Sequence, residues 1–75
     1  MADHTIDVKG LNCPLPIMQA KKTMKGLQHG ETLEVFATDP GSIKDFDAFC
    51  RTTGNELVET ANDNGVYTFT IKKGA

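Results

Sequence analysis

The chain has 75 residues, of which 39% are hydrophobic and 24% are charged, and its formal net charge is −2. Its length predicts a single domain over residues 1–75, and a chain this short buries only about 60% of its unfolded surface. A negative net charge argues against direct nucleic-acid binding, because neutralising phosphates needs a basic surface. Two cysteines, Cys13 and Cys50, are too few for a disulfide scaffold, and no leader or long apolar run is present. We therefore expect a cytoplasmic protein that makes no membrane contact.

The first elements are a strand and a helix. Residues 4–9 alternate, with Ile6 and Val8 on one side, which predicts a strand. A helix is expected from residue 14 or 16 to about 28, because proline is well accommodated in a first helical turn. Gly30 ends the segment. The residues expected to face the core from this helix follow helical spacing: they are Ile17, Ala20, Met24 and Leu27.

A second strand and a second helix follow. Residues 31–38 alternate again and place Leu33, Val35 and Ala37 on one face of a strand. Asp39 and Pro40 then supply an N-cap and a first-turn proline for a helix that Gly54 closes. The expected buried face of this helix consists of Ile43, Phe46, Phe49 and Cys50.

The last third of the chain predicts a hairpin. Strands over 56–61 and 66–73 are joined by Asn-Asp-Asn-Gly, in which Asn-Gly is a strong hairpin signal. Tyr67, Phe69 and Ile71 alternate toward the core, which favours a packing role over a base-stacking platform. The order β-α-β-α-β-β predicts an α/β (α+β) two-layer sandwich, with two helices on one face of a four-stranded mixed sheet. Its first two strands should be parallel, with a right-handed crossover.

Cys13 is the candidate functional residue, because it directly precedes the first helix. The positive end of a helix dipole favours thiolate, so we expect the pKa of Cys13 to lie modestly below its ordinary value. Pro14 and Pro16 remove two backbone donors and present the thiol rigidly, leaving mainly the N–H groups of Leu15 and Ile17. No His, Asp or Glu lies within five residues of Cys13 to act as a base. The alternative is a half-exposed cysteine that only caps the helix.

Charge and helix phase point to a surface around this cysteine. Residues 8–30 carry four lysines and no acidic residue, whereas the rest of the chain has a net charge of −6. Such a basic surround can stabilise a sulfur anion and attract an acidic partner, although a solvated helix face has the same composition. The helical step also places Leu15 and Met18 on the outer side beside Cys13, as a docking patch or as ordinary exposed residues. The lysines expected near the thiol are Lys9, Lys21, Lys22 and Lys25, of which Lys22 shares the outer side with Leu15 and Met18.

The remaining cysteine and the histidines have simpler interpretations. Cys50 lies on the apolar stripe of the second helix and is expected in the core, with a resolving or redox role toward Cys13 as the alternative. The redox-type Cys-x-x-Cys pattern is absent. His4 and His29 raise the question of zinc, but their spacing to the cysteines matches no short zinc motif, so no metal is expected.

Residues 10–16, Gly-Leu-Asn-Cys-Pro-Leu-Pro, resemble the TusA/SirA-like sulfur-carrier family, whose signature is a Cys-Pro-x-Pro box at the start of the first helix. Gly-Glu-Thr-Leu-Glu-Val at 30–35 and Thr-Asp-Pro at 38–40 extend the resemblance over nearly all of the chain. Leu15 occupies the variable position of the box, where some relatives have a polar or acidic residue. The simplest interpretation of Asp39 is a helix cap, and the family also has an acidic residue at this position.

The resemblance implies a carrier that accepts sulfane sulfur on Cys13 as a covalent persulfide, without a separate cofactor, and passes it to a protein acceptor. The donor would be a cysteine desulfurase or a rhodanese, and the relay would serve tRNA thiolation, dissimilatory sulfur oxidation or regulation. Whether such a carrier counts as an enzyme depends on the partner enzymes with which it acts. Two other functions stay open: a non-catalytic module that binds RNA or a regulatory protein, and a redox switch between Cys13 and Cys50.

Overall fold

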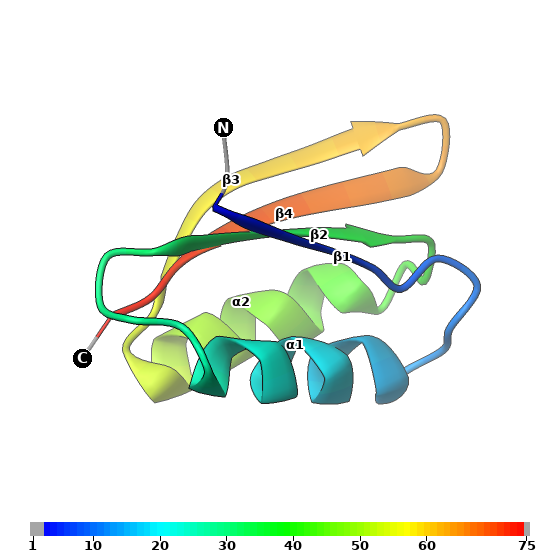
Figure 1. The fold of residues 1–75 in the computed structure, drawn as a ribbon. Helices are drawn as coiled ribbons and strands as arrows, with labels where there is room; N and C mark the ends of the chain where they lie inside the picture. Colours follow the sequence, from blue (N-terminus) through cyan, green and yellow to red (C-terminus); the bar gives the residue numbers. More distant parts are fainter. Residues whose placement is uncertain (1–2, 75) are drawn as a thin grey trace.

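The computed structural model describes residues 3–74. The sheet order is β1-β2-β4-β3, in which β1 and β2 are parallel and the other pairs are antiparallel. Both helices cover the same face of this mixed sheet (Figure 1). The predicted α/β two-layer sandwich is therefore confirmed. Its elements are β1 (His4–Asp7), α1 (Leu15–Lys25), β2 (Thr32–Ala37), α2 (Ser42–Thr53), β3 (Glu56–Asp63) and β4 (Val66–Lys72).

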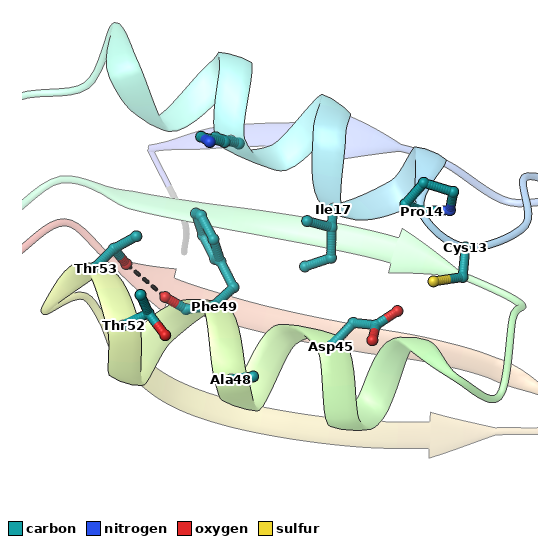
Figure 2. A pocket seen from close by; sticks show the side chains of 9 residues that line it. Cys13, Pro14, Ile17, Asp45, Ala48, Phe49, Thr52 and Thr53 are labelled. Carbon is teal, nitrogen blue, oxygen red and sulfur yellow. Dashed lines mark hydrogen bonds between the residues drawn. The ribbon is translucent and has the colours of Figure 1, made fainter.

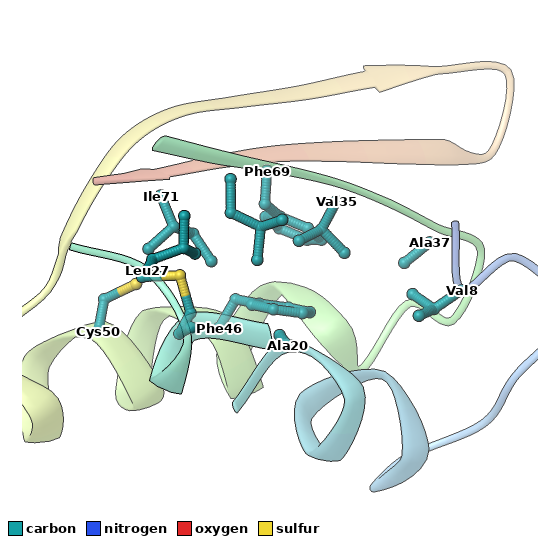
Figure 3. Packing of buried hydrophobic residues seen from close by; sticks show 11 residues of the cluster. Val8, Ala20, Leu27, Val35, Ala37, Phe46, Cys50, Phe69 and Ile71 are labelled. Atoms are coloured by element: carbon teal, nitrogen blue, oxygen red, sulfur yellow. The ribbon is translucent and has the colours of Figure 1, made fainter. Parts of the chain in front are cut away.

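The core lies between the sheet and the two helices (Figure 3). The inward faces of β2 and β4 alternate as predicted, and Tyr67 is the one expected core residue of β4 that is only partly buried. The ring of Phe46 on α2 stacks on that of Phe69 on β4, with 4.6 Å between centroids. This aromatic pair joins the layers at the centre of the molecule. The other buried hydrophobic residues are Val8, Ala20, Met24, Leu27, Leu33, Val35, Ala37, Cys50 and Ile71.

Helix α1 begins and ends close to the predicted residues. Pro14 occupies the N-cap position, and the helix stops at Lys25 because the next N–H groups bond to carbonyls three residues back, Gly26 to Thr23 and Leu27 to Met24. Leu27 is still buried although it lies beyond the helix. Ile17, predicted to be buried, is only partly covered.

The buried face of α2 differs from the prediction. Ile43 is 44% exposed, whereas Ser42 is 1% exposed and takes the expected place of Ile43 in the core. At 100° per residue, Ser42 lies nearer than Ile43 to the centre of the stripe formed by Phe46, Phe49 and Cys50. The prediction of Ile43 as a core residue was wrong because it weighed hydrophobicity above helix phase.

The hairpin turn is tighter than expected. Asn64 and Gly65 both have positive φ, 52° and 86°, and alone connect Asp63 to Val66. Such a two-residue turn matches the twist of the strands and suits Asn-Gly. Strand β3 therefore runs two residues further than predicted, and its register shifts between Leu57 and Glu59.

Candidate functional site around Cys13

Cys13 lies in the loop between β1 and α1, and its side chain is exposed. The Cys13 N–H donates to Asp39 Oδ2 at 2.8 Å, and the Gly41 N–H donates to Asp39 Oδ1 at 3.2 Å. The peptide bond between Cys13 and Pro14 is cis. A single carboxylate thus fixes the Cys13 backbone to the segment that leads into α2. The N-cap position of α2 is Gly41 and not Asp39 as predicted, although the Asp39 side chain accepts a hydrogen bond from the Gly41 N–H as a capping residue does.

A groove of about 370 Å³ runs between α1 and α2, and Cys13 lies at one end of it (Figure 2). Its floor is apolar, with Ile17 from α1 and Phe49 from α2. Lys21 and Asp45 bring charges of opposite sign to its walls. A smaller hollow of about 130 Å³ shares Lys21 and Phe49 with the groove. The partial exposure of Ile17 and Phe49 therefore has a structural reason: both side chains line this groove.

The electrostatic environment of the thiol is the opposite of the predicted one. The pKa of Cys13 is raised, first by a hydrogen bond to the Asp45 side chain, then by desolvation and by the negative charges of Asp45 and Asp39. The expected assistance from the start of α1 is also reduced, because the Leu15 N–H donates to the Asn12 carbonyl. The prediction of a lowered pKa was wrong because Asp45 lies 32 positions along the chain from Cys13.

The residues predicted to form the outer surface of α1 are exposed. Leu15 and Met18 are 45% and 56% exposed, on the helix that Cys13 precedes. Pro14 is exposed at the cap, whereas Pro16 is fully buried and anchors the first turn. The predicted lysines divide between several places: Lys21 lines the groove, Lys25 lines the smaller hollow, Lys22 is exposed, and Lys9 pairs with Asp7 at 2.8 Å.

Cys50 is a core residue, as predicted. It is 3% exposed, and burial, together with the charge of Asp47, raises the pKa of its thiol to about 11. Both cysteines are free, so the structure holds no Cys13–Cys50 disulfide.

Between residues 3 and 74, no three His, Cys, Asp or Glu side chains gather as a metal ion would require. In the same part of the chain, no helix is long and apolar enough to cross a membrane.

The fold and site define a small α/β protein that presents one free thiol at the start of its first helix. The sequence pattern of the family described as Sulfurtransferase TusA matches residues 4–73. The chain therefore belongs to the TusA family of sulfur-relay carriers.

Three similar proteins agree with this membership. The sulfur carrier protein TusA of Allochromatium vinosum is 56% identical over 71 residues, which cover 95% of this chain and 93% of that protein. A putative sulfur carrier protein of Neisseria meningitidis serogroup A is 47% identical and covers 96% of this chain and 97% of its own. The crystal structure of a SirA-like protein from Desulfitobacterium hafniense superimposes with a TM-score of 0.84 at 31% identity, covering 96% and 99% of the two chains.

Proposed function

We propose that this protein carries sulfane sulfur as a persulfide on Cys13 and passes it to a partner protein. The observation that carries the proposal is the contrast in access: the Cys13 thiol is exposed at the mouth of a groove, whereas the Cys50 thiol is closed into the core. The family membership and the names of the relatives agree with this function.

The chemistry needs only the cysteine itself. The Cys13 sulfur attacks the outer sulfur of a donor persulfide; a new S–S bond forms, the donor S–S bond breaks, and the donor leaves as a thiolate. In the second half of the relay, a thiolate of the acceptor attacks the outer sulfur on Cys13 and releases the Cys13 thiolate. The sulfur is held covalently between these steps, so we propose that no further cofactor takes part.

The partners would dock on the exposed surface of α1. Leu15 and Met18 offer apolar contacts beside the thiol, and Lys21, Lys22 and Lys25 favour an acidic partner surface. Pro14 and Pro16 hold the first turn that presents these side chains. We propose a cysteine desulfurase or a rhodanese as the donor and a second protein as the acceptor. A reducing cytoplasm suits a carrier that must keep its thiol free.

Intact mass measurements test the carrier function. The protein is incubated with a cysteine desulfurase and cysteine, or with a rhodanese and thiosulfate, and is weighed with and without a reductant. We expect one added sulfur atom that the reductant removes, present in Cys50→Ser and absent from Cys13→Ser. A wild-type protein that gains no sulfur from either donor, or a Cys13→Ser variant that still gains it, would contradict the proposal.

Docking is tested separately with Met18→Glu. A carboxylate at this exposed position should slow sulfur transfer between the protein and its partner, because it places negative charge in the apolar patch that faces an acidic surface. The rate at which Cys13 reacts with iodoacetamide should stay unchanged, since this small reagent needs no docking surface. Equal transfer rates for the variant and the wild type would show that Met18 lies outside the docking surface.

A further inference from the structure

Asp45 holds an unusual position for a surface carboxylate. It lies in the first turn of α2, is partly buried, and lines the groove together with Cys13. Figure 2 shows its carboxylate pointing toward the Cys13 sulfur. Within residues 3–74, Asp45 belongs to no ion pair, whereas Asp47 on the same helix pairs with Arg51 at 2.6 Å. Asp45 therefore faces the thiol without an ion-pair partner among these residues.

The contact between Asp45 and Cys13 is built into the backbone. Asp39 accepts hydrogen bonds from the N–H groups of Cys13 and Gly41, and the Asp45 N–H donates to the Gly41 carbonyl at 3.2 Å. These bonds connect the cysteine loop to the first turn of α2. The network holds the backbone of Asp45 close to the cysteine loop, and its side chain lines the groove beside Cys13.

This arrangement acts differently on the two forms of Cys13. A neutral thiol can donate a hydrogen bond to the Asp45 carboxylate, which stabilises the protonated form. A persulfide loses its proton more readily than a thiol, because its charge spreads over two bonded sulfur atoms. The persulfide anion has no proton to donate, and the charges of Asp45 and Asp39 repel it. Lys21, on α1, is the cationic residue that lines the same groove.

We propose, on the basis of the carrier function above, that Asp45 distinguishes the unloaded from the loaded state of Cys13. It holds the unloaded thiol in the groove as a hydrogen-bond donor, whereas the loaded persulfide anion has no proton to donate and is not held there, so that its outer sulfur is free to face the partner. The unloaded carrier is thereby protected from unwanted nucleophilic reactions, and the loaded carrier is ready to transfer.

The atoms balance through this cycle. On loading, the Cys13 thiol gives up its proton, its sulfur bonds to the outer sulfur of the donor persulfide, and the donor S–S bond breaks. The departing donor thiolate takes up a proton, so no net charge accumulates. The sulfane sulfur keeps its oxidation level, and no external oxidant or reductant is consumed. Asp45 changes only the protonation of Cys13 before and after the exchange.

The first test measures the pH dependence of the iodoacetamide reaction of unloaded Cys13. Asp45→Asn should move the midpoint to lower pH and raise the rate at pH 7 about three- to tenfold, because a tenfold change in thiolate corresponds to one pH unit. Asp47→Asn is the matched control: it removes one negative charge from the same helix, at an exposed position already paired with Arg51, and should leave the midpoint unchanged. Asp45→Ser provides a second neutral variant, and urea unfolding confirms that each variant is folded.

The second test repeats the measurement on protein loaded with inorganic polysulfide. The persulfide is already ionised at pH 7, so Asp45→Asn should change its alkylation rate less than about twofold. The proposal would be overturned if Asp45→Asn and Asp45→Ser, both folded, left the midpoint of the unloaded thiol unchanged. It would also be overturned if Asp45→Asn accelerated the alkylation of thiol and persulfide equally. The thiol measurement uses no sulfur donor, so its outcome is independent of whether a desulfurase or rhodanese loads Cys13.

Discussion

The two ends of α2 raise the pKa of a cysteine thiol by different physical causes. Near its C-terminal end, Cys50 is packed beneath the sheet, and burial is the main cause that raises its pKa to about 11. Near its N-terminal end, Asp45 faces the exposed Cys13 thiol across the groove, and its carboxylate, which can accept a hydrogen bond from that thiol, is the main cause that raises the pKa of Cys13. Exclusion of water cannot be reversed without unfolding, whereas a single carboxylate can be neutralised, displaced or outcompeted by a ligand. One helix thus keeps one thiol permanently inert and the other conditionally protonated.

The sharpest test of this comparison is selective alkylation. At pH 8 a thiol with a pKa of about 11 is ionised in only about one molecule in a thousand, and Cys50 is also shielded from reagents. Folded protein treated with iodoacetamide should therefore gain one adduct, at Cys13. Cys13→Ser should gain none when folded and one in urea, as intact mass will show. Rapid labelling of Cys50 in the folded protein would remove the contrast between the two ends of α2.

The next largest effect comes from opening the core. Phe46→Ala removes the ring that stacks on Phe69 and should lower the free energy of unfolding by about 3–5 kcal/mol. A domain of this size is marginally stable, so Cys50 should then be alkylated without urea. Ile43→Ala, on the exposed side of the same helix, is the control and should change the free energy of unfolding by less than about 0.5 kcal/mol in urea titrations. Similar losses in the free energy of unfolding for Phe46→Ala and Ile43→Ala would contradict the assignment of Phe46 to the buried face of α2 and of Ile43 to the exposed face.

A smaller loss is expected from Asp39→Asn. The carboxylate accepts from two N–H groups, those of Cys13 and Gly41, whereas an amide has only one acceptor oxygen. We expect the free energy of unfolding, measured in urea, to fall by about 1–3 kcal/mol. Asp45→Asn should change the free energy of unfolding less than Asp39→Asn does. Its main effect should be on the pH midpoint of the reaction of Cys13 with iodoacetamide. If Asp39→Asn proved as stable as the wild type, the loop of Cys13 would be held by other contacts.

The smallest expected change is a gain, and not a loss, in the free energy of unfolding. The Ser42 hydroxyl at the start of α2 is buried and finds no hydrogen-bond partner among the described residues. Ser42→Ala removes this unpaired group with little change in shape and should raise the free energy of unfolding by about 1 kcal/mol. Thermal or urea unfolding measures the gain. A loss of stability would indicate that the hydroxyl is solvated or bonded in solution.

Local pattern was sufficient for most of the fold. Alternation along β2 and β4, helical spacing on α1 and the Asn-Gly turn each depend on residues close in sequence, and the structure confirms them. The error at Ile43 arose because hydrophobicity was weighed above helix phase, which places Ser42 nearer than Ile43 to the centre of the apolar stripe of α2. The limits of the helices moved by a few residues for another reason, since helix ends are settled by local hydrogen bonds such as that of Gly26.

The sequence by itself determined the order of elements, the exposed position of Cys13 ahead of a helix and the burial of Cys50, because each follows from neighbouring residues. Only the tertiary structure decided the chemistry around Cys13. Asp39 accepts a hydrogen bond from the Cys13 backbone N–H, and Asp45 faces the thiol across the groove; a separation of more than 20 residues leaves no periodic signal for either contact. Electrostatic interactions depend on distance in space, so a pKa predicted from near neighbours alone had the wrong sign.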